Sequence, residues 1–283
     1  MLSYRLRSDD GFMGNTHALS VAAVVLSLAA FLPTIFFKLT TSKDVIVLVA
    51  ALVIALGAGL LPDLDNTTSS AISTLGPIGS ALSFIMRITS EGMYAISHTG
   101  KEPSESDPHR GFWHTAFAGI ILGIVTMLLM KFNTPMFKIN GNKFSFATLL
   151  LFILILIGFE LAITGLLGKQ TRKLRNSITG PLVLWLIGIV FSLLIIFLMP
   201  TLKSYTWVGV MVIIGYVTHI LGDTLTTSGT PILWPLSHNG KRWWSYRLPP
   251  HIHADGPTEH HIFLPLFAAI VIIAIIKLAI GGV

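Results

Sequence analysis

The sequence contains no cysteine and few charged residues. Disulfide frameworks, thiolate metal sites and cysteine nucleophiles are therefore excluded. Only 11% of the 283 residues are Asp, Glu, Lys or Arg, against about 25% in a typical soluble domain. Hydrophobic residues make up 53%, which excludes a disordered chain. The composition predicts an integral membrane protein.

Long apolar runs recur along the whole chain. A helix needs about 20 mostly apolar residues to cross the hydrocarbon core of a bilayer. About seven runs approach this length: 17–37, 45–61, 112–130, 146–167, 181–200, 206–222 and 261–280. A shorter apolar run at 76–89 predicts an interfacial or re-entrant helix. We expect one all-α, polytopic membrane domain over residues 1–283, whose first span is a retained anchor rather than a cleaved signal peptide.

The excess of basic residues is attributed to membrane orientation. The net charge is +6, and basic side chains gather on the cytoplasmic side of membrane proteins. With seven spans, twelve Lys and Arg residues fall on the side of the N-terminus and seven on the other. This distribution predicts a multi-pass protein of a bacterial or archaeal cytoplasmic (inner) membrane, with a cytoplasmic N-terminus and no nucleic-acid partner.

Histidines and carboxylates collect at one predicted membrane face. Two long connections, about 62–111 and 223–260, lie on that face, and loops of this length usually have a function. Ionisable groups are costly at membrane depth, so their clustering indicates a shared role. The clustered residues are His17, Asp63, Asp65, His109, His114, His219, Asp223 and Glu259.

These residue types are those that bind zinc, manganese or iron when no thiol is present. His219 and Asp223 are four residues apart, so on a helix they share one face and can hold the same ion. Asp63 and Asp65 follow a proline, where their carboxylates are expected to converge. The number of ligands allows one or two ions, of which Zn²⁺ is the first choice.

Simpler interpretations exist for each residue taken singly. A histidine at a membrane interface can hydrogen-bond a lipid headgroup or the backbone. The LPDLD segment can be a helix stop with Asp65 as an N-cap. His219 and Asp223 can join helices through a hydrogen bond. A metal site is preferred because five separate elements deliver ligand-type residues to one face.

Four segments together resemble a known family. NTHALS, LLPDLD, HRGFWH and HILGDTLTTSGTPILWPLS are similar to those of the YdjM-like membrane-bound metal-dependent hydrolases, which are LexA-regulated and associated with the inner membrane. The resemblance runs from about residue 13 to residue 261. It implies a hydrolase with a divalent metal, which maps onto His17, Asp63, Asp65, His109, His114, His219 and Asp223.

The order of these residues is also loosely similar to that of zinc-dependent phospholipase C. In those enzymes a Glu follows the HxxxD pair, and Glu259 is the counterpart here. This similarity favours cleavage of a phosphoester by metal-activated water. In such a reaction Asp65 or Glu259 is the expected ligand or general base, and Arg110 is the expected anion-binding cation.

The predicted function is that of a membrane-embedded, metal-dependent hydrolase. Its expected substrate is a phosphoester of a membrane lipid or lipid-linked molecule at the cytoplasmic face. One alternative is a metal-ion or proton-coupled transporter, although transport sites usually lie near the bilayer midplane. A membrane stress-response scaffold without enzymatic activity is the other. An intramembrane zinc protease is disfavoured, because no HExxH motif is present.

Overall fold

The structure is a computed structural model, and it is almost entirely helical. It describes residues 13–33, 40–66, 69–103, 110–132, 134–139, 142–175, 177, 179–199 and 204–281. The longer helices in chain order are α1 (Gly14–Phe31), α2 (Ser42–Leu60), α4 (Pro77–Ser97), α5 (Ala116–Leu129), α6 (Phe146–Arg175), α7 (Gly180–Leu198), α8 (Trp207–Thr224) and α9 (Leu264–Ile280). The shorter elements are η1 (Pro62–Asp65), α3 (Ser70–Leu75), η2 (Phe112–His114), β1 (Pro135–Ile139), β2 (Asn142–Ser145) and η3 (Glu259–Phe263).

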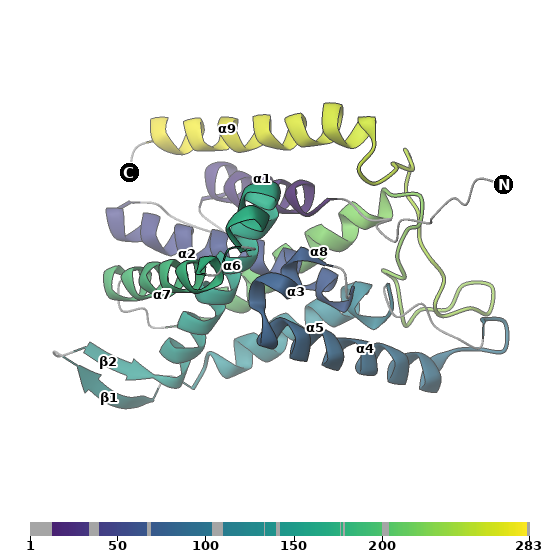
Figure 1. The fold of residues 1–283 in the computed structure, drawn as a ribbon, viewed down its shortest axis with the longest axis horizontal. Helices are drawn as coiled ribbons and strands as arrows, with labels where there is room; N and C mark the ends of the chain where they lie inside the picture. The colour runs from purple at the N-terminus through teal and green to yellow at the C-terminus, as the bar shows by residue number, and fades with distance from the viewer. Residues whose placement is uncertain are drawn as a thin grey trace.

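The bundle has α2 near its centre and α7 and α9 at its periphery (Figure 1). Helix α2 packs against α1, α6 and α8, whereas α9 lies along α1. The outward side chains of the peripheral helices are apolar, for example Val190 of α7 and Ile272 of α9, which are 64% and 56% exposed. An apolar outer surface is the pattern expected of helices that face lipid, so the prediction of a polytopic, all-α membrane protein is confirmed.

Six helices among the described residues are long and apolar enough to cross a membrane, rather than the seven predicted. The difference lies in the run at 112–130. Its first residues form the short turn η2, and the helix that follows, α5, has only 14 residues. At 1.5 Å per residue α5 is about 21 Å long, shorter than the roughly 30 Å hydrocarbon core.

Two further elements differ from expectation. The helix predicted at 76–89 continues to Ser97 and is 21 residues long. It buries small and polar residues such as Ser83 and Ser90 and exposes Phe84 and Ile88, so its apolar face is turned outward. The strands β1 and β2 form an antiparallel hairpin that the apolar pattern did not reveal.

Glycines bring the central helices into close contact. Gly57 of α2 faces Gly158 of α6. A Cβ on Gly158 would lie 2.5 Å from the carbonyl oxygen of Val53 in α2. Gly215 of α8 lies against α2 in the same way, facing the carbonyl of Ala55. Small residues at membrane helix interfaces allow backbones to approach closely. These contacts fix the ends of α2 and α8, from which the polar residues project.

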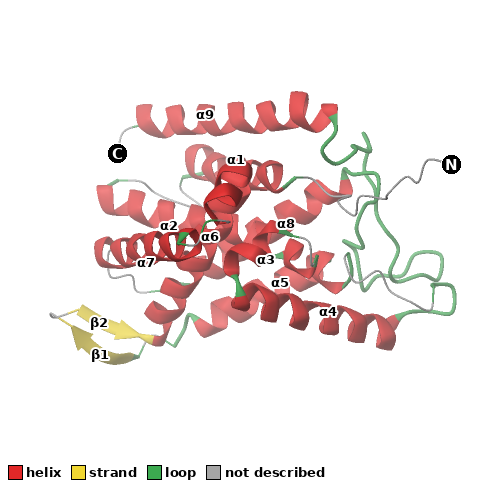
Figure 2. Ribbon diagram, in the orientation of Figure 1, coloured by secondary structure: helices red, strands yellow, loops and turns green. Residues whose placement is uncertain are grey.

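The long loops gather at one end of the bundle, and the hairpin lies at the other (Figure 2). The two long connections are tied to each other. The carboxylate of Glu102 accepts backbone hydrogen bonds from Thr99, at 2.5 Å, and from Trp243. The hydroxyl of Thr99 donates to the carbonyl of Gly240 at 2.7 Å. The loop-bearing end is therefore held together by contacts between segments about 140 residues apart in sequence.

Candidate metal centre

Helix α8 supplies His219 and Asp223 at its last turns. Both side chains are buried, and His219 Nε2 lies 3.5 Å from Asp223 Oδ2. The i,i+4 spacing places them one above the other on the helix, as expected from the sequence. The last turn is held by Thr226, whose hydroxyl donates to the carbonyl of Asp223 at 2.7 Å. The pair is thus fixed at the loop-bearing end of the bundle.

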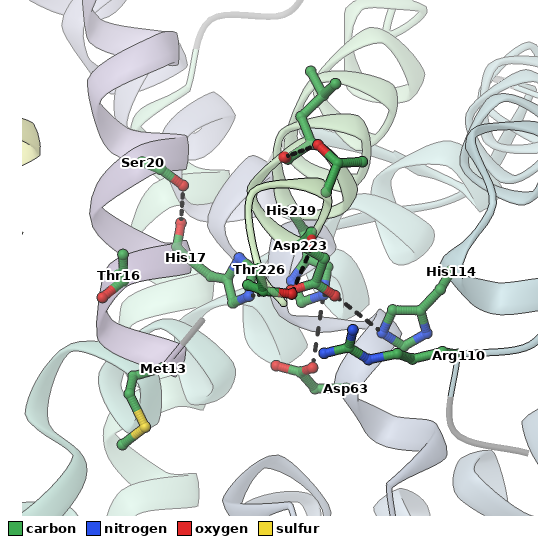
Figure 3. Close-up of polar contacts among 12 residues, drawn as sticks. Met13, Thr16, His17, Ser20, Asp63, Arg110, His114, His219, Asp223 and Thr226 are labelled. Atoms are coloured by element: carbon green, nitrogen blue, oxygen red, sulfur yellow. Dashed lines mark hydrogen bonds and ion pairs between the residues drawn. The ribbon is translucent and has the colours of Figure 1, made fainter. Parts of the chain in front are cut away.

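Helix α1 contributes His17, which lies within its first turns and is fully buried. His17 Nε2 is 3.2 Å from Asp223 Oδ1. The imidazole rings of His17 and His219 stack, with ring centroids 3.7 Å apart. One carboxylate therefore faces two histidines that lie far apart in the sequence (Figure 3).

The two aspartates of LPDLD contact different histidines. Asp63 Oδ1 is 3.6 Å from His219 Nε2, and its side chain keeps 27% of its surface exposed. Asp65 is buried, and its Oδ2 is 3.1 Å from His114 Nδ1. They lie in a 3-10 turn with about three residues per turn, so side chains two positions apart diverge. The expected convergence of these two carboxylates is therefore replaced by two separate contacts.

His114 ends the short turn η2 and completes the cluster. Its Nε2 is 3.6 Å from Asp223 Oδ2, while its Nδ1 faces Asp65. The turn is held from α8 by Tyr216, a residue not singled out in the sequence, whose hydroxyl donates to the carbonyl of Trp113 at 2.5 Å. The signal that could have identified Tyr216 is its position one turn before His219.

The ligand atoms form two overlapping groups: His17, Asp63 and His219, and His114, His219 and Asp223. Within each group the atoms lie within 4.8 Å of one another. A tetrahedral ion with ligands at 2.0–2.2 Å separates its ligand atoms by about 3.4 Å. Three separations within the groups are close to that value: 3.6 Å between His219 and Asp63, 3.5 Å between His219 and Asp223, and 3.6 Å between His114 and Asp223. The donor set and its spacing thus fit a divalent cation, with His219 shared between the groups.

Arg110 lies beside the cluster in an unusual backbone conformation, with φ of 101°. Its Nη1 donates to the carbonyl of Gly229 at 2.7 Å. Its Nη2 is buried and has no hydrogen-bond partner among the residues that the structure describes. The guanidinium points toward the cluster between Asp63 and His114 (Figure 3). It therefore presents a free pair of N–H donors next to the candidate ligands.

Two other predicted residues have different positions. Glu259 is fully buried in η3, and its carboxylate accepts the backbone N–H of Met13 at 2.7 Å and that of Asp255 at 2.9 Å. Both of its oxygens thus bind backbone amides and fasten the start of α1 to the segment before α9. His109 lies outside the residues that the structure describes.

The fold and the cluster together define a polytopic membrane protein with buried histidine–aspartate groups suited to a metal ion. A sequence model described as "YdjM inner membrane protein" matches residues 12–168 and 181–281. The chain therefore belongs to the YdjM inner membrane protein family. The family resemblance drawn from the sequence motifs is confirmed.

Two curated relatives are both called "Inner membrane protein YdjM", one from Escherichia coli (strain K12) and one from Shigella flexneri. The chain is 39% identical to each over 56 residues, which is 19% of this chain. The match spans about a quarter (26%) of either relative's length. No solved structure matches the chain.

Proposed function

We propose that the protein is a membrane-embedded, metal-dependent hydrolase that cleaves a phosphoester of a lipid or lipid-linked substrate. The observation that carries the proposal is the metal-like spacing of His17, Asp63, His114, His219 and Asp223 at one end of the helices. A divalent cation, zinc as first choice, would supply Lewis acidity and make water a competent nucleophile at neutral pH. When the short helix α5 is counted as a seventh crossing, the Lys and Arg distribution favours the cytoplasmic face.

The surrounding residues have separate tasks in this proposal. Asp65 accepts His114 Nδ1–H and so orients the ring with Nε2 toward the ligand position, as carboxylates commonly do behind metal-binding histidines. Asp63 is the partly exposed carboxylate of the cluster, so it is the one that meets an entering substrate. Arg110 binds the anionic phosphoryl group and stabilises the charge that develops on it.

The position of the cluster favours a hydrolase over a transporter. Transport sites usually lie near the bilayer midplane between broken helices. Here the ligands come from the first turns of α1, the last turns of α8 and the short turns η1 and η2. A site at headgroup depth meets the polar parts of lipids as they diffuse laterally, which is the geometry that a lipid phosphoesterase needs.

The test is elemental analysis of detergent-purified protein. Wild type is expected to carry near-stoichiometric zinc, manganese or iron, and His219→Ala and Asp223→Ala to lose it. His238→Ala is the matched control, because His238 is an exposed loop residue. Gel filtration and thermal unfolding show whether each variant is folded. Wild-type protein that carries no metal and cannot be reloaded with any would contradict the proposal. If the wild-type protein does carry metal, the metal-loaded protein is next assayed for hydrolysis of phospholipids.

A further inference from the structure

An apolar groove runs along the outside of the bundle between α1, α8 and α9. Its volume is about 630 Å³, within the range of ligand-binding cavities. Its walls include Val24 and Phe31 of α1, Leu221 of α8 and Phe267 of α9. Val24, Phe31 and Leu221 are also 37%, 56% and 47% exposed, so the groove opens to the outer surface of the bundle.

The end of the groove lies beside residues that carry the candidate metal centre. On α1 it is lined from Ser20 onward, and His17 lies three residues earlier on the same helical face. On α8 it is lined by Gly222 and Leu225, the residues immediately before and two after Asp223. On α1 the lining therefore continues toward His17, whereas on α8 the groove is lined by a face next to the one that carries His219 and Asp223.

The lining presents hydrocarbon rather than polar groups. The hydroxyl of Ser20 donates to the carbonyl of His17 at 2.8 Å, and that of Thr218 donates to the carbonyl of Ile214 at 2.7 Å. These two hydroxyls are thus satisfied by their own helices. A sugar or peptide would find few partners in such a groove, whereas an alkyl chain needs none.

The length of the groove matches one leaflet of a bilayer. The lining residues Ser20 and Leu32 of α1 are twelve positions apart, which is about 18 Å at 1.5 Å per residue. Half of a typical hydrocarbon core is about 15 Å. A lipid tail lying in the groove would therefore extend from headgroup depth, where the histidines and aspartates cluster, into the centre of the membrane.

We propose that this groove binds one acyl chain of the substrate lipid and places its phosphoester at the cluster. The inference rests on the function proposed above and names the substrate class, an acyl-chain lipid of the leaflet nearest the site. The groove would orient the lipid by its tail while Arg110 and the ligand cluster receive its headgroup. Chain length, and not only headgroup, would then determine how well a lipid is bound.

The test uses the full chain in liposomes that contain phosphatidylglycerol with a photoreactive diazirine on one acyl chain. After irradiation, mass spectrometry of peptides locates the label. We expect labels on α1, α8 and α9 at the groove, in excess of those on α7. The Val24→Trp variant places an indole in the groove. If the indole displaces two methylenes of the bound acyl chain, the affinity of the groove for the chain, and with it the labelling, is expected to fall roughly tenfold. Val190→Trp, on the exposed face of α7, is the matched control and should leave it unchanged.

The outcomes separate this inference from the proposed function. Equal labelling of α7 and the groove, or groove labelling that Val24→Trp does not lower, would overturn the acyl-chain site. If the groove is labelled as expected but the protein binds no metal, the acyl-chain site is supported and the proposed metal-dependent hydrolase is refuted. If both hold, the metal-loaded protein should cleave long-chain phospholipids with a lower KM than short-chain ones, and Val24→Trp should reduce that difference.

Discussion

At the scale of single residues, the clearest division of labour is that between Asp65 and Asp63. Asp65 is buried against His114 Nδ1 and so acts through that ring. We expect Asp65→Asn to weaken metal binding about 10- to 100-fold, the usual effect of removing such a partner. Titration with zinc in competition with a chelator measures the affinity. The control is Asp255→Asn, which alters an exposed pair with His260 and should leave the zinc affinity unchanged. If Asp65→Asn also binds zinc as tightly as the wild type, the carboxylate of Asp65 does not orient His114.

Arg110 gives a second test at this scale, which concerns anion binding rather than metal binding. Arg110→Gln removes the guanidinium but not the ligands, so metal content should be retained. Affinity of the metal-loaded protein for inorganic phosphate should fall roughly 10- to 100-fold, because hydrogen bonds to charged groups are worth about 1.5–3 kcal/mol. Calorimetry measures this affinity. The control is Arg247→Gln, whose guanidinium binds the carbonyl of Ser228; equal losses in both variants would refute a specific role for Arg110.

At the scale of elements, the contact between α2 and α8 determines where His219 and Asp223 lie. A Cβ on Gly215 would collide with the carbonyl of Ala55. We expect Gly215→Ala to destabilise the protein by about 1–3 kcal/mol, as overpacking usually does. Thermal unfolding in detergent measures the loss. Gly92→Ala is the control, because no atom lies within 4 Å of a Cβ at that exposed position of α4, and Ala favours a helix over Gly.

Element order shows how far the sequence could predict the fold. Long apolar runs identified most of the membrane helices, because burial in lipid demands about 20 apolar residues without interruption. The run at 112–130 was misleading: hydropathy does not distinguish the turn that carries His114 from the helix that follows it. Likewise, helix α4 ended later than its apolar run because its buried face includes polar residues, such as Ser83 and Ser90, which hydropathy does not detect.

Which residues form the candidate site was easier to predict than how those residues contact one another. The spacing of His219 and Asp223 specifies a shared helix face, and the structure agrees. The partners of Asp63 and Asp65 depend on how α2 meets α5 and α8 in space, which no local pattern contains. The same is true of Glu259, whose backbone contacts with Met13 and Asp255 join distant segments.

At the scale of the whole molecule, the link between the two long connections should depend on pH. Partial burial raises the pKa of Glu102, but the backbone donors of Trp243 and Thr99 outweigh it, so the pKa lies below its ordinary value of 4.5. The carboxylate therefore stabilises the link above about pH 4.5, and this contribution is lost as the pH falls through the lowered pKa.

Hydrogen exchange of the segment around Trp243, corrected for the intrinsic effect of pH, measures this dependence. Protection is expected near neutral pH and should decline below about pH 4.5. Glu102→Gln should exchange faster at neutral pH, because an amide is a weaker acceptor than a carboxylate. Glu91→Gln, at an exposed position of α4, serves as the control. Exchange that is the same in Glu102→Gln and wild type would show that other contacts hold the connections together.

The left-handed backbone at Arg110 has a consequence for protein engineering. A φ of 101° is costly for any residue with a Cβ and natural for glycine. Screens that select only for thermal resistance should therefore enrich Arg110→Gly, and those that recommend residues from backbone geometry should suggest the same change. The most heat-resistant descendants of this protein would then lack the cation that the proposed function assigns to binding the substrate's phosphoryl group.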